Sequence, residues 1–154
     1  MPQSRIEYRI LLSSPSDLPD ERKIAEEVVE EVSKTWGTPS GCVLRLLSWE
    51  NDVAPQFGDE PQAVINKSLG DEWDIYLGLM HSRFGNETKK YGSGTEEEFE
   101  RAYALWNENP RIRQIMFYFK KGLVDIDSID PAQLTRVKDF KKKDVQIGRF
   151  IQRV

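Results

Sequence analysis

The stretch DIYLGLM, residues 74–80, decides the fold that we expect for this chain. It is apolar after its first residue, Asp74, and such a run is typical of a strand covered on both faces in a parallel sheet. We therefore expect this strand to lie at the centre of the sheet, with helices on both sides.

Apolar runs elsewhere in the chain are expected to supply the other strands. They are Tyr8–Leu12, Val43–Trp49 and Ile115–Phe119, with 147–154 as either a fifth strand or a trailing segment. Helical patterns alternate with these runs, and right-handed crossovers between neighbours favour the strand order 2-1-3-4-5. The expected fold is α/β: a flavodoxin-like three-layer sandwich around a mainly parallel sheet of about five strands.

The expected helices show apolar residues at spacings of three and four. In the first helix these residues form a stripe, widened by Ala25 and Val29, that consists of Ile24, Val28, Val32 and Trp36. Three more helices are expected: one that begins at Pro61, one from Thr95 to about Trp106, and one that Asp130 caps. Residues 1–154 are expected to form a single domain.

Composition narrows the range of functions. The 22 basic and 26 acidic residues are interspersed, so no nucleic-acid partner is expected. No apolar run approaches the length of about 18 residues that a membrane span needs, and the N-terminus has no signal-peptide core. We expect a cytoplasmic protein without a membrane partner. A single cysteine, Cys42, and a single histidine, His81, argue against disulfide scaffolds and zinc sites, and we expect no bound metal or cofactor.

The loops after the expected strands exclude several common chemistries. The first loop, SSPSD at 13–17, lacks the glycines with which a dinucleotide-binding turn approaches pyrophosphate. A phosphate-accepting receiver domain would need an aspartate at the end of its third strand, where this chain has Met80 and His81. A serine triad would depend on His81, which is more typical of a surface residue.

The segment GTEEE, residues 94–98, has both a structural and a functional interpretation. Thr95 followed by Glu98 is the spacing of a capping box, in which both side chains bind free N–H groups at a helix start. The same helix should begin beside the carboxyl end of the central strand, where open α/β sheets bind ligands. A carboxylate there could stabilise the positive charge that develops on a sugar during glycosidic cleavage.

Several of these motifs together resemble a TIR-like family of unknown function. They are LLSSPSDL at 11–18 with Glu21 and Arg22, DIYLG at 74–78, SRFG at 82–85 and GSGTEEE at 92–98. The resemblance covers roughly residues 5–140. Members of this family commonly precede NACHT or other signalling NTPase, WD-repeat or TPR modules. The pattern of Gly94, Thr95, Glu98 and Ala102 is also similar to that of nucleoside deoxyribosyltransferases.

The resemblance implies a role for individual residues. Glu98 would be the catalytic carboxylate, and Ser82 would match the loop serine of TIR enzymes that cleave NAD. Phe84 stands where many of those enzymes have tryptophan, so it could stack on a ligand. The remaining substrate-binding residues would be Ser13, Ser14 and Asp17 from the first loop, Trp49 and Glu50 from the second, and Arg83, Gly94 and Thr95.

The resemblance further implies that residues 1–154 are a TIR-like domain, the N-terminal module of a longer protein, with a signalling function. The leading hypothesis is an effector domain that cleaves the N-glycosidic bond of NAD or a related nucleotide when its host protein assembles. Its partners would be the nucleotide, further copies or other TIR-like domains, and C-terminal NTPase or repeat modules. The alternatives are a non-catalytic interaction module and a deoxyribosyltransferase-like enzyme.

Overall fold

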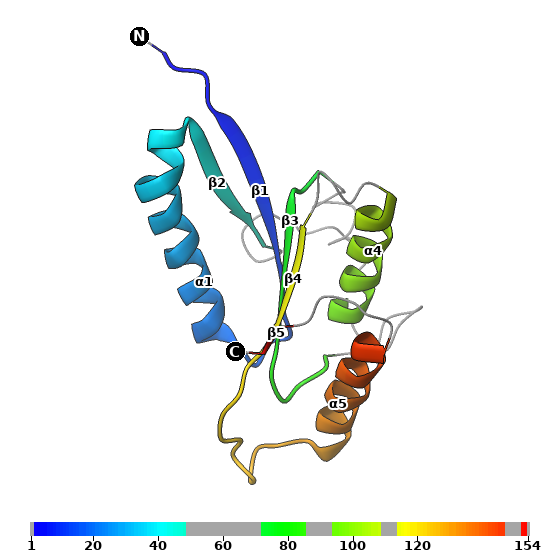
Figure 1. Ribbon diagram of the computed structural model, residues 1–154. Coiled ribbons are helices and arrows are strands. Elements are labelled where there is room, and N and C mark those ends of the chain that lie inside the picture. The colour runs from blue at the N-terminus through cyan, green and yellow to red at the C-terminus, as the bar shows by residue number, and fades with distance from the viewer. Residues whose placement is uncertain (1, 49–71, 86–93, 109–113, 147–151, 154) are drawn as a thin grey trace, which may run out of the picture.

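The computed structural model describes residues 2–48, 72–85, 94–108, 114–146 and 152–153 (Figure 1). The helix expected to begin at Pro61 lies outside these ranges, as do Trp49 and Glu50. Within them, the order of strands and helices agrees with the alternation that the sequence predicts.

Four strands form a parallel sheet in the order β2-β1-β3-β4. Their bounds are β1 (Ile6–Ser13), β2 (Cys42–Leu47), β3 (Ile75–Met80) and β4 (Gln114–Phe119). The expected interior position of β3 is confirmed, because β1 and β4 pair with its two edges. Of the uncertain fifth strand, the described residues contain β5 (Gln152–Arg153), which pairs in parallel with the end of β4.

Helices lie on both sides of this sheet. One side carries α1 (Pro19–Val32), which continues into a π-helical turn, Ser33–Gly37. The other side carries α4 (Gly94–Glu108) and α5 (Pro131–Gln146), as Figure 1 shows. The expected start of α5 is confirmed, since a carboxylate oxygen of Asp130 accepts the backbone N–H of Ala132 at 2.9 Å. The α/β architecture is therefore as the sequence predicts.

An aromatic core fills the space between the sheet and the two helices α4 and α5. Phe117 of β4 lies edge-on to Phe99 of α4, with ring centres 5.3 Å apart, and packs on Phe140 of α5 at 5.4 Å. Gly78 of β3 makes room for this ring, because a Cβ atom there would lie 2.3 Å from the nearest Phe117 ring carbon. Phe117 thus connects the sheet to both helices.

The opposite face of β3 is less completely covered. The side chains of β3 alternate between the two faces, so Tyr76 and Met80 are fully buried against α4 and α5. Ile75, Leu77 and Leu79 point to the α1 side and are only half-buried. Among the described elements, α1 makes its main strand contacts with β2, at the edge of the sheet, so this face of β3 is covered less completely than the face toward α4 and α5.

The apolar stripe by which the sequence identifies the first helix is largely exposed rather than packed against the sheet. Its four residues are exposed to different degrees: Ile24 by 56%, Val28 by 50%, Val32 by 37% and Trp36 by 71%. Small residues instead make the contact with β2. The Ser33 hydroxyl accepts the Leu44 N–H at 2.9 Å, and a Cβ on Gly37 would lie 2.9 Å from the Cys42 carbonyl oxygen. Such a close approach leaves no room for larger side chains, which therefore occupy the flank of the helix.

Replacing Gly78 by alanine should destabilise the fold by about 1–3 kcal/mol, because the added methyl group overpacks the core against Phe117. Chemical denaturation of Gly78→Ala would measure the loss. In a protein that already carries Phe117→Leu, the same substitution should lower the free energy of unfolding by less, because the smaller leucine side chain can move away from the added methyl group. Equal costs in both backgrounds would contradict the contact between Gly78 and Phe117.

Candidate functional site

The carboxyl ends of β1 and β3 bring together the loops from which the sequence predicts a site. Ser13 is the last residue of β1 and is 1% exposed. Its hydroxyl donates a hydrogen bond to a carboxylate oxygen of Glu98, which lies in the first turns of α4 and is half-buried. Two residues 85 positions apart in sequence, each predicted for the site, are therefore in direct contact.

The helix start around Glu98 differs from the expected capping box. α4 begins at Gly94, so Thr95 lies inside the helix rather than at the capping position that precedes it. Thr95 is 6% exposed and belongs to the buried residues of α4. The Glu98 carboxylate meets the Ser13 hydroxyl across the sheet edge, and that contact cannot be read from the Thr95 to Glu98 spacing.

Arg22 of α1 holds the first loop in place. Its guanidinium donates to the Ser14 hydroxyl and the Ser14 carbonyl, both at 2.6 Å, and to the Pro15 carbonyl at 3.0 Å. Ser14, predicted to bind substrate, is thus bonded to a helix of its own chain. The bonds between Arg22 and two backbone carbonyls fix the path of the loop between Ser13 and Asp17.

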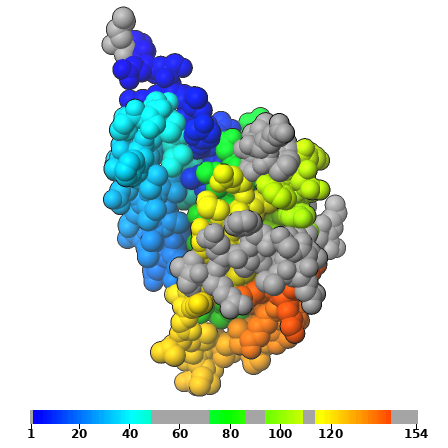
Figure 2. Space-filling view, viewed as in Figure 1, coloured from blue at the N-terminus to red at the C-terminus, as the bar shows by residue number. Residues whose placement is uncertain are grey.

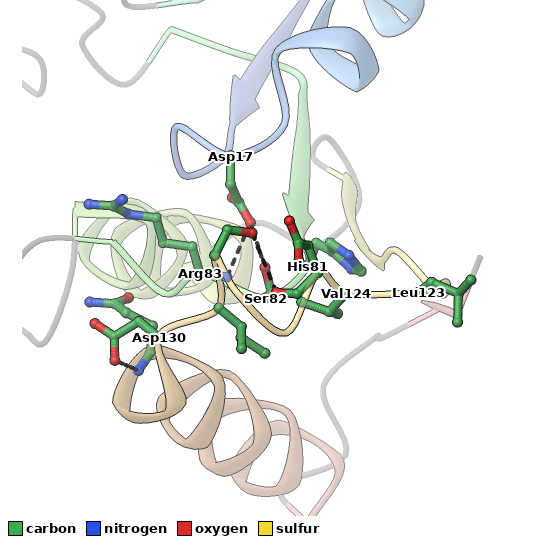
Figure 3. A pocket seen from close by; sticks show the side chains of 11 residues that line it. Asp17, His81, Ser82, Arg83, Leu123, Val124 and Asp130 are labelled. Carbon is green, nitrogen blue, oxygen red and sulfur yellow. Dashed lines mark hydrogen bonds between the residues drawn. The ribbon is translucent and has the colours of Figure 1, made fainter.

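Asp17 connects the first loop to the loop that follows β3 (Figure 3). One oxygen of its carboxylate, Oδ2, accepts the Ser82 hydroxyl and the Arg83 backbone N–H, each at 3.2 Å. The other oxygen, Oδ1, is buried without a hydrogen-bond partner. All three residues were predicted for substrate binding, and the structure brings them into one pocket of about 430 Å³.

The walls of this pocket come from four segments. The lining residues are Asp17 after β1, His81 to Arg83 after β3, Leu123 to Asp125 and Ser128 to Asp130 before α5, and Gln133 of α5. Figure 3 shows Asp17 above the pocket, with the first turn of α5 and Asp130 below it. This pocket is not lined by Glu98, Ser13 or Thr95. In the described structure the predicted site residues therefore fall into two groups, one in the pocket and one around Glu98.

Gln133 fixes the wall that follows β3. Its side-chain oxygen accepts the backbone N–H groups of Phe84 and Gly85 at 2.8 and 2.9 Å, and its amide nitrogen donates to the Gly85 carbonyl at 3.2 Å. Sequence reasoning missed this residue. A glutamine in the first turn of a helix carries no pattern that would link it to a loop 48 positions earlier.

Phe84 contributes its side chain to the core. Its side chain is 4% exposed, and its ring packs on Phe140 with the ring centres 5.7 Å apart. The expectation that it could stack on a ligand stays a prediction, and in this structure its ring is part of the core. Its position inside the core anchors the loop whose backbone Gln133 holds.

An ion pair lies at the same edge of the sheet. Lys120, just after β4, donates a hydrogen bond to the Glu21 carboxylate in the first turn of α1. This hydrogen bond holds the pKa of the Glu21 carboxyl below its ordinary value and raises that of the Lys120 amine. The Lys120 carbonyl lies 3.0 Å from Nδ1 of His81, so the ends of β3 and β4 are also joined.

The described ranges show neither a metal cluster nor a membrane span. They contain no group of three His, Cys, Asp or Glu side chains arranged to hold a metal ion. None of their helices combines the length and the hydropathy that crossing a bilayer requires.

Replacing Gln133 by alanine should destabilise the protein by about 1–3 kcal/mol, because two buried N–H groups lose their acceptor. Hydrogen exchange at the Phe84 and Gly85 amides should become faster than in the wild type. Gln114→Ala removes an exposed glutamine of β4 and should leave both amides protected. Unchanged exchange in Gln133→Ala would contradict the role of Gln133 as the loop anchor.

Comparison with known proteins gives one match. The model of the family described as "Domain of unknown function (DUF4062)" matches residues 9–154. No curated protein and no solved structure matches the chain. Because the match extends from within β1 to the last residue, the chain belongs to the DUF4062 family.

Proposed function

We propose that this chain is a TIR-like effector domain that cleaves the N-glycosidic bond of NAD or a related nucleotide. In this proposal the sheet has the flavodoxin-like order 2-1-3-4-5, with β5 as the fifth strand. Glu98 is the catalytic carboxylate, and the domain becomes active when its host protein assembles. The observation that carries the proposal is the hydrogen bond between Ser13 and Glu98 at the carboxyl end of the sheet.

The position of Glu98 suits an electrostatic role. Buried Ser13 offers its hydroxyl to only one of the two Glu98 oxygens, Oε2, and so orients the carboxylate. Glu98 is half-buried in the first turns of α4, beside the carboxyl end of the sheet. A carboxylate oriented in this way can oppose positive charge without first reorganising.

The reaction follows from that charge. When the bond between ribose C1′ and the nicotinamide nitrogen breaks, the electron pair leaves with nicotinamide and C1′ becomes oxocarbenium-like. The Glu98 carboxylate would stabilise this positive charge. Water then attacks C1′ and releases one proton, so the products are nicotinamide, ADP-ribose and H⁺.

The pocket at Asp17 is the proposed place for the rest of the nucleotide. Its volume of about 430 Å³ lies within the range of small-molecule sites. Ser82 and Ser128 provide hydroxyl groups, and Arg83 and His81 provide nitrogen groups. The Asp17 and Gln133 bonds hold the walls before any ligand arrives, which lowers the ordering cost of binding.

Replacing Glu98 by glutamine should lower nicotinamide release by about 10²–10³-fold, because a neutral amide cannot stabilise the oxocarbenium charge. Ser13→Ala should cause a smaller loss, because Glu98 keeps its charge and loses only its orientation. The assay would use NAD and protein clustered by a fused oligomerising domain, with circular dichroism to show that each variant is folded. Glu97→Gln, at the neighbouring position of the same helix, is the matched control and should retain activity.

The outcomes separate the alternatives. Full activity of Glu98→Gln would remove Glu98 as the catalyst. If clustered wild-type protein releases no nicotinamide, the non-catalytic interaction module is the better interpretation. Exchange of nucleobases between deoxynucleosides in the same preparation would instead identify a deoxyribosyltransferase-like enzyme.

A further inference from the structure

On the α1 side of the sheet, the described ranges of the chain leave a group of apolar side chains exposed or only half-buried. It joins two sets of side chains, and we call it the open apolar surface. The α1 set is Ile24, Val28 and Val32 of α1 with Trp36 of the π-helical turn that follows it, all at least 37% exposed. The strand set is Ile75, Leu77, Leu79, Met116 and Tyr118, all half-buried. Apolar side chains that remain exposed beside half-buried ones can mark a site of association.

The two sets face a common space. Residues that follow Glu21 by three and seven positions, Ile24 and Val28, lie on the same side of α1 as Glu21 itself. The Glu21 carboxylate binds Lys120, the residue that follows β4. The stripe of α1 is therefore directed along the sheet toward β4, over the half-buried side chains of β3 and β4. Figure 1 shows α1 on one side of the sheet, with β3 and β4 beyond it.

The solvent-facing edge of this surface is acidic. On a helix of 3.6 residues per turn, Asp20, Glu27 and Glu31 lie close together, next to the stripe and on its outer side. All three are exposed. Figure 2 shows α1, in blue to cyan, at the surface of the molecule. A segment that binds over the apolar side chains would therefore have one of its edges next to these three carboxylates.

We propose that the open apolar surface binds an amphipathic α-helix whose apolar face is bordered by basic residues. A helix is the element that covers parallel strands, and one lying beside α1 at the usual distance of about 8–10 Å would cover both sets of side chains. Lysine or arginine along its border would pair with Asp20, Glu27 and Glu31. This proposal does not depend on Glu98 or on cleavage of a nucleotide.

A second copy of this chain is a poorer occupant than such a helix. In a symmetric dimer each α1 would present its stripe to the other, and each stripe has the same acidic border. When the two helices run antiparallel, Glu27 and Glu31 approach carboxylates of the partner copy, which costs free energy, and when they run parallel the two acidic borders lie on opposite sides and gain no basic partner from each other. Charge complementarity therefore favours a basic helix over self-association through this surface.

Two synthetic helical peptides of equal length would test the proposal. Both have the same leucine ridge, and they differ only in having lysine or glutamate along its borders. Fluorescence anisotropy with the whole 154-residue chain should show saturable binding of the lysine peptide, at least about tenfold tighter than that of the glutamate peptide. Changes in amide chemical shifts should fall on α1, β3 and β4.

Matched variants place the binding on this surface. Val28→Glu puts a charge in the middle of the stripe and should lower the affinity for the lysine peptide by at least about tenfold. Ile126→Glu makes the same change in charge at an 86% exposed residue outside the surface and should bind as the wild type does. The double variant with Glu27→Lys and Glu31→Lys should bind the glutamate peptide more tightly than the lysine peptide.

Three results would overturn the proposal. The first is equal binding of the lysine peptide to wild type and Val28→Glu, and the second is the absence of saturable binding at millimolar peptide. The third is a dimer in analytical ultracentrifugation that Val28→Glu dissociates and Ile126→Glu does not, because a second copy would then occupy the surface.

Discussion

One row of three residues across the sheet determines much of this structure. They are Ser13 of β1, Gly78 of β3 and Phe117 of β4, which lie opposite one another, so the side chains of Ser13 and Phe117 point to the same face. The middle residue has no side chain, so the large ring of Phe117 can lean over β3. That ring then receives Phe99 of α4 and Phe140 of α5. Because Phe99 is fixed in this way, Glu98 beside it can reach Ser13 at the other end of the row.

The sequence predicts the strands and most helix boundaries because each depends on local patterns. The run at 74–80 and the cap at Asp130 are examples, and both are confirmed. It did not predict which side of α1 meets the sheet. The large side chains form the clearer stripe, but the close approach of Ser33 and Gly37 to β2 depends on the three-dimensional distance between helix and strand. Apolar periodicity therefore identified the helix but did not predict its contact face.

The candidate site could be predicted only in part for a similar reason. Loops at the carboxyl ends of parallel strands must meet, so the contacts of Ser13 with Glu98 and of Asp17 with Ser82 follow from topology. Topology gives no information on whether a side chain in such a loop turns inward, as Phe84 does, or outward. It also did not reveal Gln133, because a single amide that binds two backbone N–H groups leaves no periodic pattern in the sequence.

The interior position of β1 also affects how this chain can form during synthesis. β1 pairs with β3 through residues about 65 positions downstream, such as Leu11 with Tyr76. During synthesis the most buried part of β1, Ile10 to Ser13, therefore lacks one of its two pairing strands until β3 has left the ribosome. Long-range parallel pairing of this kind slows folding and prolongs the exposure of unpaired strand edges. The first half of this domain should consequently depend on chaperones more than a helical segment of equal length would.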